Sequence, residues 1–221
     1  MDVRDTPEEA QFRAELRAWI DANLPQEHRG GRGGARRFEE FGREWSRKLY
    51  DAGYAGLTWP KEYGGAGAPY SYQAIFLEET ARAEAPPHVG VIGLGMAGPT
   101  IIVHGTEEQK QRYLAKILSA EEIWCQGFSE PDAGSDLAAC RTRAELRGDR
   151  FVVNGQKVWS SFAHIADWCI LVTNSDSDGQ RYRNLTYLLV DMHSPGVEVR
   201  PLRQITGEAE FNEIFFSDVE V

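Results

Sequence analysis

The feature that most constrains the fold of this 221-residue chain is a change of periodicity near Glu122. Before it, apolar residues such as Leu16 and Ile20 recur at helical spacing. After it, short apolar segments alternate with turn residues, which is typical of strands. Helices followed by strands predict an α+β protein. We expect an all-α domain over residues 1–122 and an antiparallel, barrel-like β domain over residues 123–221.

Capping signals mark two helix starts. Thr6-Pro7-Glu8-Glu9 combines an N-cap threonine, a proline at the first helical position and a capping-box glutamate. Thr106-Glu107-Glu108-Gln109 repeats the capping box before a helix predicted to run through Leu118. Further helices are predicted to end near Gly53 and to span residues 71–85.

Turn chemistry predicts the loops. Residues 25–37, rich in glycine and arginine, are expected to form a loop, and residues 174–184 an exposed hairpin loop. Asn154-Gly155 is expected to be the two-residue turn of a hairpin, because this dipeptide favours a type I′ turn. Apolar strands are predicted at residues 168–173 and 185–191.

Charge and hydropathy exclude some classes of partner. The 24 basic and 34 acidic residues give a formal net charge of -10, which argues against nucleic acids and anionic membranes. No apolar run approaches the roughly 20 residues of a membrane span, and the acidic N-terminus is unlike a signal peptide. We therefore expect a cytoplasmic protein without a membrane span.

The sequence offers no metal or disulfide pattern. Cys125, Cys140 and Cys169 are odd in number and lack CxxC spacing, so buried free thiols are expected. His164 is expected to have a structural or surface role, because no catalytic partner for it is visible in the sequence.

Two separated stretches carry the chemistry. Trp124 to Asp136 begins as a strand and breaks into a loop, whose backbone N–H groups and the hydroxyls of Ser129 and Ser135 are free to face a ligand. Val158 to Ser161 places the Trp159 indole beside two hydroxyls, which together offer an apolar wall and hydrogen bonds at the edge of a planar ring. The two stretches together predict a flavin site.

These stretches resemble the motifs of the acyl-CoA dehydrogenases. Gly127–Asp136 is similar to the flavin loop of that family, and Gly155–Trp159 is similar to its Asn-Gly-x-Lys-x-Trp motif. His104–Lys110 with Tyr113-Leu114, and Gly207 to Phe216, also match. The resemblance covers nearly the whole chain in the right order.

The resemblance implies a reaction. A carboxylate removes a proton from the carbon next to a thioester carbonyl while a hydride leaves the neighbouring carbon for FAD, and electrons then pass to an electron-transfer flavoprotein. The residues implied to bind the cofactor are Gln126, Gly127, Phe128, Ser129, Gly134, Ser135, Trp159, Ser160 and Ser161.

Individual roles follow from the same resemblance. Ser129 would hydrogen-bond the pyrimidine edge of the flavin, Trp159 would pack beside the ring, and Ser161 would lie near its reactive nitrogen. Ser135 would also contact the acyl-CoA substrate where its pantetheine or phosphate groups pass. Glu130 and Asp136 are expected to accept backbone N–H bonds rather than to act as the base.

The base of the family is a glutamate in a C-terminal four-helix domain, which this chain, ending at Val221, is expected to lack. We therefore assign no catalytic residue here and expect the chain alone to bind FAD weakly and to be inactive. A homo- or hetero-oligomer, such as a dimer of dimers, is expected.

The stretch Val89–Gly98 contains a formal GxGxxG, which would suggest a dinucleotide-binding turn. Pro99 and the capping box that follows disfavour that interpretation, because a second strand is required there. We expect instead that the small residues let a helix backbone approach the acyl chain, with Gly95 and Met96 as substrate contacts.

Phe162 departs from the family, which commonly has glycine or asparagine there, and Phe128 replaces smaller aliphatic residues. These rings would narrow or reshape the substrate channel, so the substrate class stays open. The resemblance of residues 196–216 to actinobacterial members of the family hints at bulky, branched or ring-bearing acyl groups. Two alternatives also stay open: a non-catalytic, truncated partner subunit of a heteromeric dehydrogenase, and a flavin monooxygenase or nitroalkane oxidase of the same fold.

Overall fold

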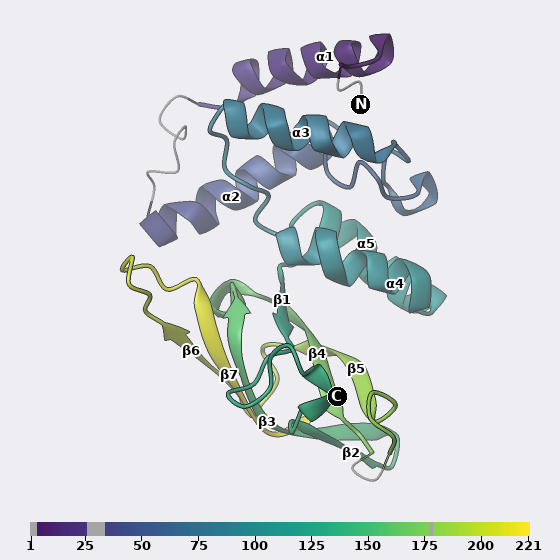
Figure 1. Ribbon diagram of the computed structural model, residues 1–221, viewed down its shortest axis with the longest axis vertical. Helices are drawn as coiled ribbons and strands as arrows, with labels where there is room; N and C mark the ends of the chain where they lie inside the picture. Colours follow the sequence, from purple (N-terminus) through teal and green to yellow (C-terminus); the bar gives the residue numbers. More distant parts are fainter. Residues whose placement is uncertain (1–3, 26–33, 177–178) are drawn as a thin grey trace. The chain divides into compact units, whose positions relative to one another are not determined.

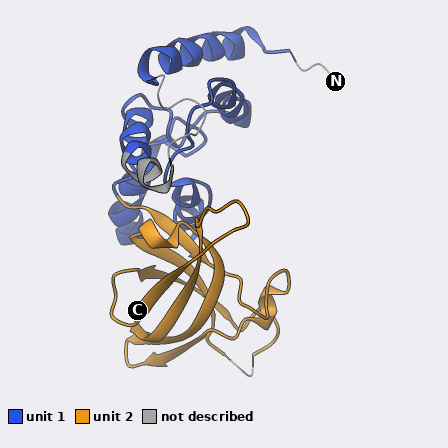
Figure 2. Ribbon diagram, turned by 90° about the vertical axis from the view of Figure 1, so that its left-hand side faces the viewer, with its two compact units in different colours: residues 1–121 blue, residues 122–221 orange. Residues whose placement is uncertain are grey.

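The computed structural model describes residues 4–25, 34–176 and 179–221. The chain divides into two compact units, a helical unit over residues 1–121 and a sheet unit over residues 122–221 (Figure 2). None of the helices within the described residues is both long and apolar enough to cross a membrane. Independent folding of two domains with a boundary at Glu122 stays a prediction.

The helical unit contains five α-helices in its described part, and both predicted capping boxes are present (Figure 1). The Thr6 hydroxyl accepts from the Glu9 N–H at 3.2 Å, and the Thr106 hydroxyl accepts from the Gln109 N–H at 3.3 Å. The helices are α1 (Pro7–Asn23), α2 (Gly34–Asp51), α3 (Tyr70–Arg82), α4 (Gly98–His104) and α5 (Glu107–Leu118).

A cluster of apolar side chains from α1, α2, α3 and the C-cap residues of α1 and α3 forms a core of the helical unit, because each helix buries one face. Its buried members are Leu16, Ile20, Leu24, Trp45, Leu49, Ile75 and Ala83. The predicted loop 25–37 is wrong at its end, since α2 begins at Gly34; residues 26–33 lie outside the described part.

The glycine run is helical. Gly93–Ala97 forms a π-helical turn, η3, that continues into α4, so no strand precedes a turn as a dinucleotide motif requires. A Cβ on Gly98 would lie 2.1 Å from the Trp59 ring, so glycine permits this close packing. The Trp59 indole N–H also donates to the Leu94 carbonyl at 3.2 Å.

The sheet unit is a curled sheet of seven strands in the order β1-β4-β2-β3-β7-β6, with β5 paired to β4 (Figures 1 and 2). This confirms the predicted barrel-like architecture after the helices. β1 and β2 each pair with β4 in parallel, so the sheet is mixed rather than purely antiparallel. The strands are β1 (Trp124–Gly127), β2 (Arg143–Arg147), β3 (Arg150–Ser161), β4 (Trp168–Asn174), β5 (Leu185–Asp191), β6 (Val197–Leu202) and β7 (Phe211–Glu220).

The predicted hairpin turn is wrong. The two-residue connection between β2 and β3 is Gly148-Asp149, because Arg147 pairs with Arg150. Asn154 and Gly155 lie inside β3, where the pairing with β7 shifts register at a bulge. A Cβ on Gly155 would lie 2.7 Å from the Thr142 Cα, so the glycine is needed for a close approach of two backbones rather than for a turn.

Candidate functional site

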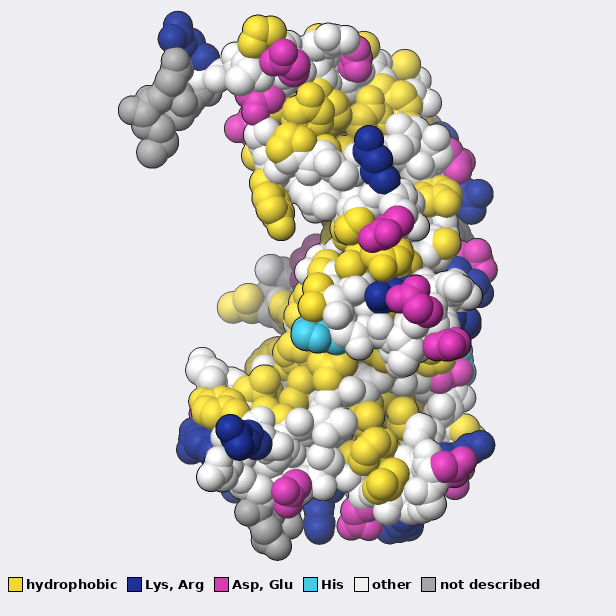
Figure 3. Space-filling view, turned by 90° about the vertical axis from the view of Figure 1, so that its right-hand side faces the viewer, with side chains coloured by type: hydrophobic (Ala, Val, Ile, Leu, Met, Phe, Trp, Pro, Cys, Tyr) yellow, Lys and Arg dark blue, Asp and Glu magenta, His cyan; other side chains and the backbone are white. Residues whose placement is uncertain are grey.

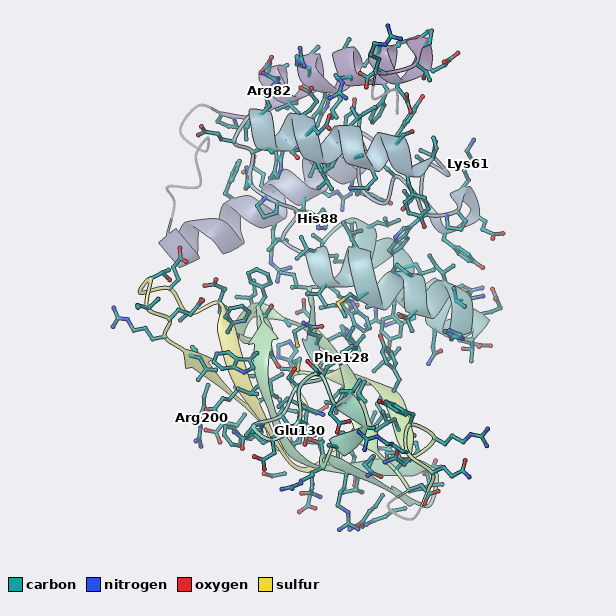
Figure 4. All side chains as sticks on the ribbon, in the orientation of Figure 1. Lys61, Arg82, His88, Phe128, Glu130 and Arg200 are labelled. Atoms are coloured by element: carbon teal, nitrogen blue, oxygen red, sulfur yellow. The ribbon has the colours of Figure 1, made fainter. Side chains whose placement is uncertain are left out.

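The flavin loop predicted from the sequence follows β1. A Cβ on Gly127 would meet the Leu171 side chain at 2.7 Å, so glycine lets the end of β1 lie against β4. The chain then leaves the sheet as the segment 128–142, called here loop 128–142, which carries the labelled Phe128 and Glu130 (Figure 4). The Glu130 N–H donates to the Ala133 carbonyl at 2.7 Å and closes a tight turn near the start of the loop.

The structure brings loop 128–142 and the end of β3 together. The Val158 N–H donates to the Ser129 carbonyl at 2.9 Å, so Ser129 lies beside the residue that precedes Trp159. The convergence of these two stretches, inferred from the sequence, is therefore present in the fold.

Trp159 occupies an unusual backbone position. The register between β3 and β7 shifts between Lys157 and Ser160, and Trp159 adopts a φ of 60° within this bulge. A left-handed conformation is costly for a bulky residue, and bulges re-aim side chains near functional sites. The indole is 58% exposed, with its ring at 89° to that of Phe211. The bulge thus presents a large aromatic surface outside the core.

The hydroxyls around the site differ in access. Ser129 and Ser161 are part-buried, and Ser135 and Gly134 are exposed. The Ser160 hydroxyl is buried and has no hydrogen-bond partner among the described residues. Ser160 is therefore less accessible to a ligand than its neighbour Ser161.

Gln126 and Phe128 flank the turn from strand to loop. Gln126 is part-buried on β1, and its side chain has no hydrogen-bond partner among the residues that the structure describes. The Phe128 ring meets that of Tyr187 edge to face, with centroids 6.4 Å apart. Both residues lie within three positions of Ser129 in the sequence.

Glu130 has a structural environment, as predicted. Its carboxylate accepts from the Arg141 N–H at 2.7 Å and the Thr142 N–H at 2.8 Å. It also accepts from the Lys157 ammonium at 2.8 Å and the Cys140 thiol at 3.1 Å. Burial raises the pKa of Glu130, but these hydrogen bonds outweigh burial and lower the pKa to about 2. Glu130 is therefore ionised and fully engaged.

Asp136 differs from the prediction. Its carboxylate makes no capping hydrogen bond to the short helical turn that follows and instead pairs with the Arg181 guanidinium. Both side chains are about half exposed or more, so the pair is solvated. The expected role as a backbone acceptor is wrong for this residue.

The three cysteines are free and buried, as expected. Cys140 is part of the Glu130 cluster: it donates to Glu130 and accepts from the Lys157 ammonium at 3.3 Å. Sequence reasoning assigned no role to Lys157, although it lies in a matched motif. Its partners are 17 to 29 positions away in the chain, so no local pattern indicates them.

Phe162 adopts a φ of 60° and a ψ of 17°, in the left-handed region. Glycine and asparagine adopt this region readily, whereas phenylalanine is strained there. A phenylalanine at position 162 therefore strains the backbone and also places a larger side chain there than glycine or asparagine would. His164, two residues on, contacts Asn212, with its Nδ1 3.2 Å from the Asn212 Nδ2, in line with the expected structural role.

Gly95 and Met96 lie on η3 in the helical unit. A Cβ on Gly95 would meet nothing within 4 Å, so its surface is open. Their role as substrate contacts stays a prediction.

A surface cavity of about 280 Å³ lies at the other end of loop 128–142, where Arg141, Arg143 and Asn174 are among the lining residues. It contains none of the residues predicted to bind the cofactor. The described residues also hold no group of three or more His, Cys, Asp or Glu side chains placed to bind a metal ion.

Comparison with known proteins gives two family matches. Residues 6–121 match the model described as the N-terminal domain of acyl-CoA dehydrogenases, and residues 125–219 match the model described as their middle domain. Acyl-CoA dehydrogenase IpdE1 of Mycobacterium tuberculosis is 48% identical over 214 residues, which is 94% of this chain and 55% of that protein.

Solved structures agree. A structure named Tcur3481-Tcur3483 steroid ACAD has a TM-score of 0.88 and 36% identity, over all of this chain and 57% of the other. A chain of the ChsE4-ChsE5 complex from Mycobacterium tuberculosis has a TM-score of 0.88 and 34% identity, over all of this chain and 56% of the other. This chain thus spans little more than half the length of these relatives.

Proposed function

Because this chain belongs to the acyl-CoA dehydrogenase family, we propose that it is the flavin-binding part of an enzyme that oxidises the α,β-bond of an acyl-CoA thioester. The observation that carries the proposal is the hydrogen bond between the Val158 N–H and the Ser129 carbonyl, because it joins the two stretches that would clamp the ring. FAD is the proposed cofactor.

The residues present fit a flavin in one specific respect. The bulge in β3 holds an exposed indole beside Ser161, while the neighbouring loop offers the hydroxyl and N–H of Ser129. The Ser129 hydroxyl, the Ser129 N–H and the Ser161 hydroxyl have no hydrogen-bond partner among the described residues. A planar heterocycle with acceptors along its edge matches this combination of an apolar wall and free donors.

Bound FAD would supply the hydride acceptor. Trp159 would cover the ring and exclude water from one side, and Ser129 would fix the pyrimidine edge through its hydroxyl and N–H. Ser161 would donate near the reactive nitrogen. Gln126, Gly127, Phe128 and Ser160 would complete the wall around these groups. Gly134 and Ser135, at the exposed part of the loop, would contact phosphate or pantetheine groups.

Each carboxylate of loop 128–142 has a partner within the chain. Glu130 is ionised and held by Lys157 and two backbone N–H groups, Asp132 pairs with Arg141, and Asp136 pairs with Arg181. The base of the family lies in a C-terminal helical domain, to which neither matching family model corresponds. We therefore propose that residues 6–219, which match the N-terminal and middle domains, do not themselves supply the base, and that the complete enzyme passes electrons to an electron-transfer flavoprotein.

The substrate proposal is a bulky, ring-bearing acyl group. It is supported by one structural neighbour, which is named a steroid ACAD. The bulky Phe128 and Phe162 side chains would narrow or reshape the channel beside the flavin.

A second candidate is a partner subunit in a heteromeric dehydrogenase. It is favoured by two structural neighbours whose names join two proteins. Large hydrophobic side chains are also exposed on this chain, among them Leu77, Val103 and Leu146, and Figure 3 shows hydrophobic side chains across one face. Single exposed hydrophobic side chains on separate elements are ordinary on protein surfaces, so the names of these two neighbours carry this candidate.

The visible absorbance of FAD, titrated with the purified chain, tests flavin binding. A shifted and better resolved flavin band would support the proposal, and a band identical to that of free FAD at saturating protein would contradict it. Adding an acyl-CoA under nitrogen then separates the two candidates. Loss of the flavin absorbance with this chain alone would contradict our proposal that its residues do not supply the base. Loss of the flavin absorbance only after a second dehydrogenase chain is added would favour the partner subunit.

A further inference from the structure

Lys157 is the most deeply buried cation of the sheet unit among the described residues, with no exposed side-chain surface. Its Nζ lies 3.0 Å from the Phe128 carbonyl, 2.8 Å from Glu130 Oε1 and 3.3 Å from Cys140 Sγ. An ammonium carries three N–H donors, and here each has one partner. All three partners belong to loop 128–142, so one side chain of β3 holds the loop at three points.

Both peptide groups of Ser129 are held by β3. The carbonyl before it, of Phe128, accepts from the Lys157 ammonium, and its own carbonyl accepts from the Val158 N–H. In a planar trans peptide, the N–H points away from the carbonyl of the same group. Fixing the Phe128 carbonyl therefore fixes the direction of the Ser129 N–H, which points away from Lys157.

The Lys157 ammonium also makes the Ser129 N–H a stronger hydrogen-bond donor. A charged donor on a carbonyl polarises the peptide group, so that the N–H on its other side becomes a better donor. The Ser129 N–H donates to no other group among the described residues, so this capacity is not consumed within the chain.

We propose that Lys157 is a positioning residue for the flavin: its ammonium, by holding the Phe128 carbonyl, aims and polarises the Ser129 N–H towards the acceptor edge of the ring. This inference rests on the proposed function, because it takes a flavin as the acceptor. Glu130 balances the charge of Lys157 within the core, and the three loop contacts set the direction.

The first experiment compares two doubly neutralised variants of the full chain. Lys157→Met/Glu130→Gln removes both buried charges without leaving either unpaired. Lys48→Met/Glu44→Gln removes an exposed ion pair of 3.0 Å in the helical unit and is the matched control. FAD affinity is expected to fall roughly tenfold in the first variant, as for the loss of one charge-assisted hydrogen bond, and not in the control.

The second readout does not depend on the cofactor. In flavin-free protein, the amide proton resonance of Ser129 is expected to move upfield in Lys157→Met/Glu130→Gln, because the peptide is less polarised, and to stay unchanged in the control. An unchanged Ser129 resonance, or FAD binding equal to that of the wild type, would overturn the inference. If wild-type protein binds no FAD, the proposed function fails, while the Ser129 resonance still decides whether Lys157 polarises the peptide.

A further measurement covers the case in which the neutralised variant does not fold. In the wild type, the Lys157 ammonium protons are expected to exchange slowly with water and to show scalar coupling to the Phe128 carbonyl carbon. Lys157→Arg keeps the charge pair, but its planar guanidinium cannot serve three partners in the same arrangement. It is expected to bind FAD several-fold more weakly; absence of the coupling, or full FAD affinity in Lys157→Arg, would count against the inference.

Discussion

The N–H of Val158 and the carbonyl of Ser129 are joined by a 2.9 Å hydrogen bond. The two residues are far apart in the chain, one on a strand and one on an irregular loop. This bond places a loop with free donors beside a bulge that exposes Trp159, and the proposed flavin site depends on that adjacency.

Glu79 should be a strong determinant of the stability of the helical unit. Its side chain is 3% exposed and pairs with Arg13 and Arg17 from α1 and with Arg82 from α3. Glu79→Ala leaves these guanidinium groups without their shared acceptor, so we expect a loss of roughly 3 kcal/mol in the free energy of unfolding. Glu78→Ala, at a carboxylate 64% exposed, should cost less than about 1 kcal/mol. Denaturant titrations giving equal losses for both variants would contradict this.

Acid should destabilise the chain in a defined pH window. The pKa of Glu79 is lowered to about 2, chiefly by Arg17, and that of Glu130 is lowered to about 2 because its hydrogen bonds outweigh burial. A lowered folded-state pKa gives stability that is present above the ordinary value near 4.5 and is lost as pH falls towards 2. Above about pH 4.5, each of the two carboxylates contributes roughly 3 kcal/mol to the free energy of unfolding.

Free energies of unfolding measured between about pH 6 and pH 2 would check this sign. Burial lowers the pKa of His88 to about 4. Keeping this side chain neutral in the folded state therefore lowers stability as pH falls from 6.5 to 4, which is a higher pH window than that of the two carboxylates. Lys157→Met/Glu130→Gln should lose less stability than the wild type below pH 4.5. An equally steep loss in that variant would show that Glu130 does not contribute.

Gly155→Ala should destabilise the sheet unit far more than Gly148→Ala. The new Cβ at residue 155 would meet the backbone of Thr142 at 2.7 Å, so we expect a cost of roughly 3 kcal/mol. At Gly148 nothing lies within 4 Å and only the left-handed φ of 69° opposes alanine, which should cost roughly 1 kcal/mol. Thermal unfolding of both variants decides the order, and a larger loss at Gly148 would contradict the assignment of the bulge.

The left-handed backbone at Phe162 predicts an unusual ranking of substitutions. Phe162→Gly should be about 1 kcal/mol more stable than Phe162→Ala, because glycine adopts a φ of 60° without strain. At Ala115, which is exposed on α5, alanine should be better than glycine: Ala115→Gly should be less stable than the wild type by roughly 1 kcal/mol. The same ranking at both positions would indicate that Phe162 is not strained in solution.

Features set by neighbouring residues could be predicted from the sequence, and features set by distant contacts could not. The helix starts at Thr6 and Thr106 are local, since each cap and its partner are three positions apart. The prediction of a turn at Asn154-Gly155 is wrong because the close approach of the Thr142 backbone determines the conformation there. The parallel pairing of β1 with β4 likewise joins strands that no local pattern connects.

The candidate site differs in one respect. The pairing of loop 128–142 with the end of β3 is a distant contact, and the family motifs predict it because they occur together, although neither stretch indicates it alone. The left-handed conformation of Trp159 and the three contacts of Lys157 depend on packing across the sheet, which residue types alone do not specify.

The central claim is that loop 128–142 and residues 158–161 hold one flavin between them. Its most direct test is the visible absorbance spectrum of FAD at saturating protein for the wild type, Ser129→Ala and Trp159→Ala, with the exposed Tyr70→Ala in the helical unit as control. We predict a shifted flavin band with the wild type and the control, and a reduced shift when either Ser129 or Trp159 is truncated. A band that shifts equally in all four proteins, or in none, would contradict the claim.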